Sequence, residues 1–245
     1  MIPARYQSSR LPGKPLRHIG DKPMIQWVYE QARQSRILDR VLVATDDHRV
    51  FECVKQFDGE AVMTSDCLSG TDRVAEAILP FEADIIVNIQ GDEPFILPKA
   101  IDLVTGILVQ DRDAVMGTLV KRIFHADELI SHNTVKVIIN NRGYAVYFSR
   151  SPVPFCRDCP NHSDWLEKTP YYKHIGLYSY RKQFLQEISR MPVSNLECSE
   201  KLEQLRVIEN GHLIKVAETD SETIGVDTPE DLIRANQMVA AGVIR

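Results

Sequence analysis

Two short, mainly apolar runs constrain the fold of this chain more than any other feature of its sequence. Val41–Thr45 and Ile85–Ile89 are rich in β-branched residues and show no regular alternation of apolar and polar side chains. Strands of this kind are buried on both faces, which is typical of a parallel sheet covered by helices. Between the two runs lie amphipathic segments, among them an expected helix over Val74–Leu79 capped by Thr71 or Asp72. Another precedes the runs at Met24–Arg33, after Pro23, a residue suited to the first helical position. This alternation predicts an α/β fold with a mostly parallel sheet.

The second half of the chain predicts an added antiparallel region. Val135–Ile139 and Tyr144–Phe148 flank Asn140–Gly143, a turn sequence typical of a β-hairpin. Further strands are expected at His174–Tyr180 and Leu213–Ala217, with helices over residues 182–190 and from residue 229 onward. Because no repeat or linker divides the chain, we expect a single domain over residues 1–245.

Composition excludes several classes of function. The chain has 245 residues, of which 44% are apolar and 26% charged, and this suits one globular enzyme. A net charge of −5 argues against a general attraction to nucleic acid. No apolar stretch is long enough to span a bilayer and the chain start lacks a secretory signal, so we expect a cytoplasmic protein without membrane insertion.

The cysteines predict reduced thiols rather than a disulfide framework. There are five, an odd number scattered along the chain. Cys156 and Cys159 form a CxxC pair, but a zinc site would need two more ligands, and only His162 and His174 are nearby. We therefore expect an ordinary loop, mobile over residues 157–168.

A short basic loop near the chain start is the first candidate for a functional site. It carries Arg5, Arg10 and Lys14 together with Pro12 and Gly13, and it matches neither the P-loop nor the GxGxxG pattern. Guanidinium groups can bind phosphate oxygens in pairs, and lysine adds a compact charge. The alternative is a solvated basic turn. The stiffening proline and the permissive glycine favour phosphate binding.

An aspartate follows the second apolar run, within Asn88–Pro94. Asp92 is expected at the edge of the sheet where open α/β folds bind ligands. A carboxylate there can bind Mg²⁺, which is commonly held by one or two carboxylates plus substrate phosphates. The alternative is that Asp92 caps a helix.

Asp227 occupies a similar place in Ile224–Asp231, after a short apolar strand. Thr228, Pro229 and Asp231 have the chemistry of a helix start, so capping is already provided by Thr228. Asp227 is then free to be a second metal ligand, unless it only accepts backbone N–H groups at the same helix start.

Taken together, these motifs resemble the 3-deoxy-manno-octulosonate (Kdo) cytidylyltransferases, also called CMP-Kdo synthetases. The family pattern includes SxRLPGKPL, NxQGDEP, YFSR, HxGxY, LEQLR and GVDTPEDL. The matching blocks are Ser8–Leu16, Asn88–Pro94, Tyr147–Arg150, His174–Tyr178, Leu202–Arg206 and Gly225–Leu232. Their order and spacing cover nearly the whole chain, so the resemblance is specific.

The resemblance implies a nucleotide-diphospho-sugar transferase-like three-layer sandwich that couples CTP to Kdo, releases pyrophosphate and supplies lipopolysaccharide synthesis as a homodimer. It implies Mg²⁺ on Asp92 and Asp227, which with Lys14 would be the catalytic residues. It implies nucleotide binding by Ala4, Arg5, Arg10, Lys14, Ser69 and Gly70. It implies sugar binding by Gln90, Arg150, His174, Tyr178, Glu203 and Gln204. Family members usually carry several apolar residues before the Ile-Pro-Ala-Arg segment, so the resemblance also implies a shortened first strand here.

Several alternatives stay open at this point. His174 could be a general base or could position substrate, and the second role is favoured because His174 lies in an expected strand. Glu203 and Gln204 lie in an expected helical run over residues 200–208, whose ordinary interpretation is an exposed face. The enzyme could act on another acidic sugar, such as 8-amino-Kdo or sialic acid. A nucleotide-binding regulatory protein is the non-enzymatic alternative, which the pairing of Asp92 with Asp227 disfavours.

Overall fold

The computed structural model describes residues 1–222 and 224–243 of the chain. Its strands are β1 Ile2–Ala4, β2 His18–Ile19, β3 Lys22–Pro23, β4 Val43–Thr45, β5 Ala61–Met63, β6 Ile85–Asn88, β7 Met116–Arg122, β8 Lys136–Ile139, β9 Ala145–Ser149, β10 Tyr172–Arg181 and β11 Ile214–Glu218. Its helices are the 3₁₀ turn η1 Lys14–Leu16 and α1 Met24–Arg33, α2 His48–Gln56, α3 Gly70–Ala77, α4 Pro98–Gln110, α5 Ala126–Ile130, α6 His162–Lys168, α7 Lys182–Ile188, α8 Asn195–Glu200, α9 Gln204–Glu209 and α10 Pro229–Ala240.

The strands form a three-stranded parallel sheet, a six-stranded mixed sheet and the separate two-stranded sheet of β2 and β3. β1 pairs in parallel with β4, which pairs in parallel with β5. β10 runs antiparallel to β6, β7 and β8, while β11 is parallel to β7. The backbone of Met1 joins the two parts, since its amino group donates to Val87 O at 2.8 Å and its carbonyl accepts from Ile89 N at 3.0 Å. β1, only three residues long, therefore lies between the strands made by the two apolar runs.

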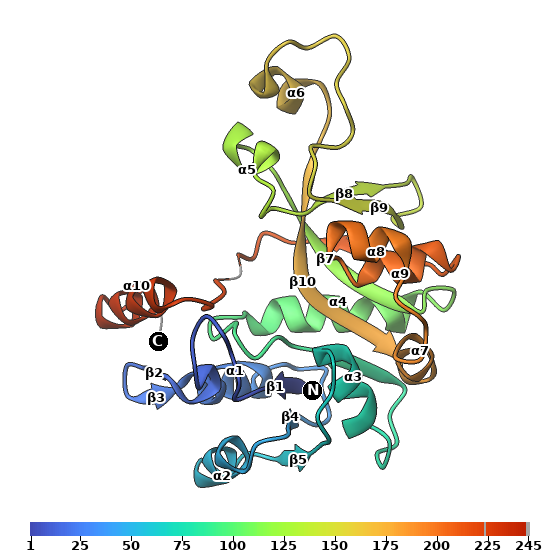
Figure 1. The fold of residues 1–245 in the computed structure, drawn as a ribbon. Helices are drawn as coiled ribbons and strands as arrows, with labels where there is room; N and C mark the ends of the chain where they lie inside the picture. Colours follow the sequence, from blue (N-terminus) through green and yellow to red (C-terminus); the bar gives the residue numbers. More distant parts are fainter. Residues whose placement is uncertain (223, 244–245) are drawn as a thin grey trace.

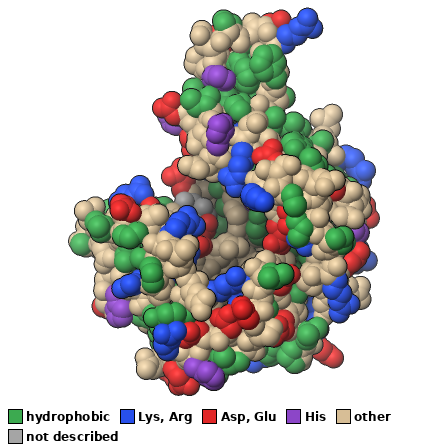
Figure 2. All heavy atoms as spheres, in the orientation of Figure 1, with side chains coloured by type: hydrophobic (Ala, Val, Ile, Leu, Met, Phe, Trp, Pro, Cys, Tyr) green, Lys and Arg blue, Asp and Glu red, His purple; other side chains and the backbone are tan. Residues whose placement is uncertain are grey.

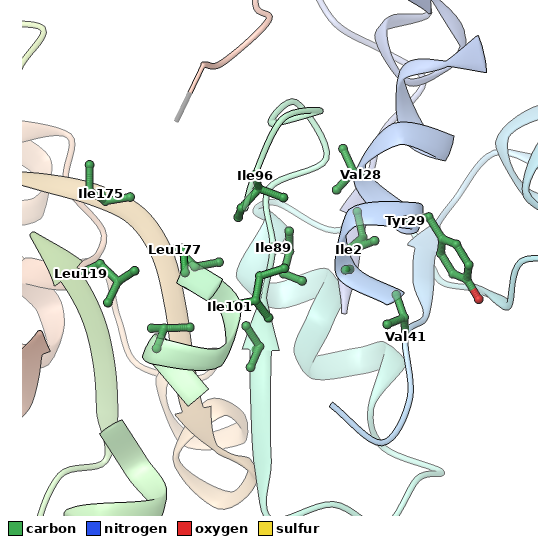
Figure 3. Close-up of a cluster of buried hydrophobic side chains, with 14 of the residues drawn as sticks. Ile2, Val28, Tyr29, Val41, Ile89, Ile96, Ile101, Leu119, Ile175 and Leu177 are labelled. Carbon is green, nitrogen blue, oxygen red and sulfur yellow. The ribbon is translucent and has the colours of Figure 1, made fainter. Parts of the chain in front are cut away.

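Helices cover both faces of the parallel part, as the unbroken apolar runs predict. Val43, Ile2 and Ile89 face a core cluster shared with α1, α2 and α4 (Figure 3). Leu42 and Ile86, their neighbours along the strands, face a second cluster shared with α3, α7 and α9. Successive strand residues point to opposite faces, so each apolar run contributes to both cores. The three-layer α/β class is confirmed, while the assignment of residues 1–245 to one domain stays a prediction.

The antiparallel region projects from this body (Figure 1). β8 and β9 form the expected hairpin, and β10 continues from the projecting part into the main sheet. The prediction of a mobile loop was wrong for part of the segment, because His162–Lys168 forms α6. Trp165 is buried there, and its indole N–H donates to Cys159 O at 3.0 Å. One buried aromatic side chain thus anchors a segment whose polar composition indicates a loop.

Two predicted helix starts are shifted in the structure. Pro23 ends β3 and lies just before α1 rather than at its first position. The cap of α3 is Ser69 rather than Thr71 or Asp72, and the Asp72 side chain returns the bond to the backbone of Ser69. Within the described part of the chain, no helix is long and apolar enough to cross a membrane.

Candidate active site

The basic loop is folded around a glycine in a left-handed conformation. Gly13 has a φ of 70°, and its N–H donates to Tyr6 O at 3.1 Å, which closes the loop. A Cβ atom at Gly13 would lie 3.3 Å from the Tyr6 ring. The ring is covered on another side by the guanidinium of Arg49, 3.4 Å from its centroid. This compact arrangement fixes Lys14 at the start of η1.

Lys14 joins the two aspartates that the sequence singles out. Its Nζ lies 2.6 Å from Asp92 Oδ2 and 3.0 Å from Asp227 Oδ1. Arg10 also reaches Asp227, with Nη2 3.0 Å from Oδ1. Burial acts to lower the pKa of Lys14, but the charges and hydrogen bonds of Asp92 and Asp227 outweigh it, so the pKa is raised. Lys14 therefore stays cationic and holds both carboxylates in one cluster.

Backbone contacts bring the two aspartates together. Val226 N donates to Asp92 O at 2.8 Å, which places the segments before the two carboxylates side by side. A Cβ at Gly91 would lie 2.7 Å from Pro3 O, so only glycine permits this approach to β1. On the other side, Thr228 caps α10 as expected and leaves the Asp227 carboxylate to Lys14 and Arg10.

Asp92 and Asp227 are the residues of this cluster that could hold a magnesium ion together with a phosphate ligand. Both carboxylates contact the ammonium group of Lys14, and each offers hard oxygen ligands. Over residues 1–222 and 224–243 there is no group of three or more His, Cys, Asp or Glu side chains that could hold a metal. The protein thus supplies few ligands, and Mg²⁺ commonly takes the remainder from phosphates and water.

A cavity of about 310 Å³, lined by polar and apolar residues alike, includes Gln90, two residues before Asp92 of this cluster. It is lined by Gly70, Thr71, Gln90, Met116, His174, Gly176, Tyr178, Tyr180, Ile188, Lys201, Leu202, Glu203 and Gln204. Figure 2 shows the hollow face of the molecule, with basic and acidic side chains around the hollow. Gln90 lines the cavity and Asp92 belongs to the Lys14 cluster, so a segment of three residues connects the two halves of the site.

The helix expected over residues 200–208 is broken, and the break forms one wall of the cavity. α8 ends at Glu200, and Lys201 takes a left-handed conformation with φ 54° and ψ 47°. α9 begins at Gln204, with Glu203 just before it. The expectation of one helical run over residues 200–208 was wrong. The cavity-lining places of Glu203 and Gln204 favour the role that the resemblance implies over the alternative of an exposed helix face.

His174 lies in β10 and is held as a neutral ring. Its Nε2 is 2.9 Å from Thr118 Oγ1, and its ring packs edge-on against Phe148 at a centroid distance of 5.2 Å. The residue keeps some exposure toward the cavity, but the surrounding protein desolvates the imidazole and lowers its pKa to about 3. A ring with this pKa is a weak proton acceptor, which supports substrate positioning over general-base catalysis.

The depressed pKa predicts an acid sensitivity that belongs to His174. Between the ordinary pKa of 6.5 and the folded value of about 3, the unfolded chain binds a proton that the folded protein does not. Stability therefore falls as the pH decreases through this interval, by up to about 1.4 kcal/mol per pH unit from this residue. In urea unfolding across the interval, His174→Asn should lose this part of the slope.

The exposed His125 provides the control for this measurement. His125→Asn should keep the wild-type slope, because the exposed side chain of His125 is surrounded by water in the folded and the unfolded protein alike. Equal slopes in the His174→Asn variant and the wild type would contradict the assignment.

Burial also governs the other ionisable groups of the cavity. It raises the pKa of the Tyr178 phenol, whose O–H donates to Gln204 Oε1 at 3.5 Å. Burial likewise raises the pKa of Glu203, and a hydrogen bond from Thr71 acts in the opposite direction. Tyr178, Glu203 and Gln204 thus give the cavity a set of hydrogen-bonding groups suited to hydroxyls.

The structure brings together some of the expected site residues and not others. Gln90, His174, Tyr178, Glu203 and Gln204 line the cavity as the resemblance implies, and Gly70, expected near the cytosine, lines it too.

Three expected residues take other places. Arg150 does not line the cavity, because its Nε donates to Glu200 O at 2.8 Å and its Nη1 to His132 O at 3.0 Å. Arg5 donates to Cys67 O, away from Lys14, and Ser69 caps α3. The roles of these three residues stay predictions.

Thr71 and Lys201 line the cavity but are absent from the residues that the motifs indicate. Thr71 looks like a helix cap in the sequence, whereas its hydroxyl contacts Glu203. Lys201 follows Glu200 in a helical pattern, and no glycine or asparagine signals the left-handed turn. No sequence motif includes Lys201, although the family block Leu202–Arg206 begins at the next residue.

Comparison with known proteins agrees with this geometry. A family model described as cytidylyltransferase matches residues 1–219. A 3-deoxy-manno-octulosonate cytidylyltransferase of Solibacter usitatus is 50% identical over 246 residues, which cover 100% of this chain and 95% of that protein. One of Trichlorobacter lovleyi is 47% identical over 252 residues, covering 99% and 98%.

A solved structure gives the same assignment. It is described as CMP:2-keto-3-deoxy-manno-octonic acid synthetase complexed with CTP, and it aligns with a TM-score of 0.91 and 46% identity over 98% of this chain and 97% of that one. The fold, the site and these matches define an enzyme of the nucleotidyltransferase class. The chain belongs to the 3-deoxy-manno-octulosonate cytidylyltransferase family.

Proposed function

We propose that this enzyme transfers CMP from CTP to the anomeric hydroxyl of Kdo, giving CMP-Kdo and pyrophosphate. The observation that carries the proposal is the segment Gln90–Asp92, which joins a charged cluster suited to phosphates to a cavity suited to a sugar. The names of the relatives and the CTP in the solved synthetase support this choice over another acidic sugar.

Arg5, Arg10 and Lys14 bind the phosphates of CTP in this proposal. Arg10 is exposed and Lys14 lies at the base of the same loop, so incoming phosphate oxygens can replace carboxylate oxygens as their partners. The cytosine lies near Ala4, Ser69 and Gly70. A Cβ atom on Gly70 would lie 3.5 Å from the side chain of Pro3, which precedes Ala4 in β1. Gly70 and Ala4 thus belong to neighbouring segments, which supports this placement.

Asp92 and Asp227 are the proposed ligands of Mg²⁺. Bound there, the ion would neutralise phosphate charge and lower the pKa of the attacking hydroxyl, so that no dedicated protein base is required. The two carboxylates would hold the ion in the Lys14 cluster, two residues along the chain from Gln90 of the cavity. Arg10 and Lys14 reduce the repulsion between two anionic substrates, which makes their close approach possible.

Gln90, His174, Tyr178, Glu203 and Gln204 hold the sugar in the cavity. Their amide, imidazole, phenol and carboxyl groups match hydroxyls that both donate and accept hydrogen bonds. The anomeric hydroxyl then attacks the α-phosphorus, its proton is lost to solvent, and pyrophosphate leaves opposite the new P–O bond. Positioning by these side chains is the main contribution of the protein.

The proposal extends to the setting of the enzyme. The product is an activated sugar for lipopolysaccharide, made in the cytoplasm, where CTP is available and thiols stay reduced. All five cysteines are free thiols, which accords with that location. We also propose a homodimer, because Phe124 and Phe155 of the projecting region are 65% and 74% exposed. Light scattering that gives a monomer mass at micromolar concentration would contradict it.

A pyrophosphate-release assay tests the activity. CTP is paired with Kdo, 8-amino-Kdo and sialic acid, and each sugar is also paired with ATP, GTP and UTP. We expect release with CTP and Kdo, at least about tenfold faster than with any other pair, as differences of a few contacts produce. Fast release with another sugar would replace Kdo by that sugar. Tight binding of CTP without release from any sugar would support the regulatory alternative.

A further inference from the structure

We propose that Lys201 binds the carboxylate of the sugar acid at the rim of the cavity and so determines that the substrate is an acid. The inference rests on the proposed function and deepens it. It concerns one charged residue that the sequence motifs do not include.

The charges of the cavity leave one partner for an anionic group. Of the described residues that line the cavity, Lys201 is the only lysine or arginine. His174 cannot serve, because burial keeps its imidazole neutral with a pKa of about 3. Lys14 and Arg10 lie in the neighbouring cluster, where the proposed function assigns them to phosphates. A sugar carboxylate placed in the cavity therefore meets its counter-charge at Lys201.

The opposite charge in the cavity reinforces this orientation. Glu203 lies two residues from Lys201, on the same wall, and would repel a carboxylate brought close to it. Its oxygens are suited to accept hydrogen bonds from sugar hydroxyls instead. An acid substrate thus binds with its carboxylate at Lys201 and its hydroxyls at Glu203 and Gln204.

Lys201 is available for this role. Over residues 1–222 and 224–243, its ammonium group has no hydrogen bond or ion pair. The adjacent carboxylate of Glu200 is occupied, since Oε1 accepts from Ser149 Oγ at 2.7 Å and Oε2 from Arg150 N at 2.9 Å. The side chain is exposed at the cavity rim, so a ligand can reach it.

The backbone of Lys201 adds an independent observation. Its φ of 54° is in the left-handed region, where glycine and asparagine are the common residues at the end of a helix. In the described chain, the other non-glycine residue with positive φ is Asp58, whose short polar side chain tolerates this region better. Residues in such sparsely populated conformations cluster at functional sites, which agrees with the proposed role of Lys201.

The left-handed backbone at Lys201 also suggests a variant that removes the charge without changing the turn. Lys201→Asn removes the charge and suits the left-handed backbone, so the turn before Glu203 is retained. We expect the KM for Kdo to rise about tenfold, as the loss of one charge-assisted hydrogen bond at a partly exposed site predicts. The KM for CTP should be unchanged. Lys201→Arg should keep the KM for Kdo within about threefold of wild type, and Lys55→Asn, on an exposed lysine of α2, should have no effect.

The decisive arm uses the carboxamide of Kdo, in which the negative charge is absent. Wild-type enzyme should prefer the acid over the amide by about tenfold, and Lys201→Asn should lose that preference. An equal preference in both proteins would overturn the inference, as would an unchanged KM for Kdo. If wild-type enzyme acts on a different sugar acid, the proposed substrate is wrong, and the same comparison with that acid and its amide still tests Lys201.

Discussion

Replacing Asp92 with asparagine is expected to lower kcat by about 10²- to 10³-fold, the range found when one group that stabilises transition-state charge is removed. The amide keeps the size of the side chain but removes its negative charge, both for a bound Mg²⁺ and for Lys14, whose Nζ is 2.6 Å away. The fold should persist, because Asp92 is only partly buried and the backbone contact of its carbonyl with Val226 does not involve the side chain. Pyrophosphate release at saturating CTP and Kdo measures the effect.

The Mg²⁺ dependence of the rate distinguishes a role of Asp92 in metal binding from a general disruption of the site. The Asp92→Asn variant should need a higher Mg²⁺ concentration for half-maximal rate, because one hard oxygen ligand is weaker. Asp113→Asn, on an exposed aspartate, is the matched control and should match wild type in both respects. A rate for Asp92→Asn within about threefold of wild type would remove Asp92 from the catalytic residues.

Replacing Lys14 with methionine is expected to reduce kcat/KM for CTP by about 100-fold, mainly through KM. Methionine keeps the apolar stem and removes the charge that pairs with Asp92 and Asp227. Two effects combine here, since a phosphate contact is lost and the two carboxylates are left to repel each other. The KM for Kdo should change by less than about threefold, because Lys14 does not line the sugar cavity.

The exposed Lys55 again supplies a comparison for net charge. Lys55→Met lowers the charge of the protein by the same amount at a distance from the cluster, so it should leave both KM values unchanged. If Lys14→Met raises the two KM values equally, the cluster acts on the whole site rather than on the nucleotide.

The strands and their burial could be predicted because each depends on a short stretch of sequence. Val41–Thr45 and Ile85–Ile89 have no polar face, so they could be stable only between two layers of helices. The hairpin around Asn140–Gly143 and the cap at Thr228 follow from local turn and capping chemistry in the same way. Helix α6 could not be predicted, since the contact that stabilises it is the burial of Trp165 in the projecting region.

The candidate site was likewise predictable from the sequence only in part. The candidate residues could be named from the sequence, because cationic side chains in a stiff loop suit phosphates and aspartates after apolar strands suit Mg²⁺. The folded structure was needed to show that Lys14 contacts Asp92, 78 residues away in sequence, and Asp227, 213 residues away. It also decided that a left-handed turn at Lys201 directs Glu203 and Gln204 into the cavity and that Arg150 binds backbone carbonyls instead. The reason is physical, since residue type fixes what a side chain can bind, whereas long-range backbone contacts such as that of Val226 with Asp92 fix which side chains meet.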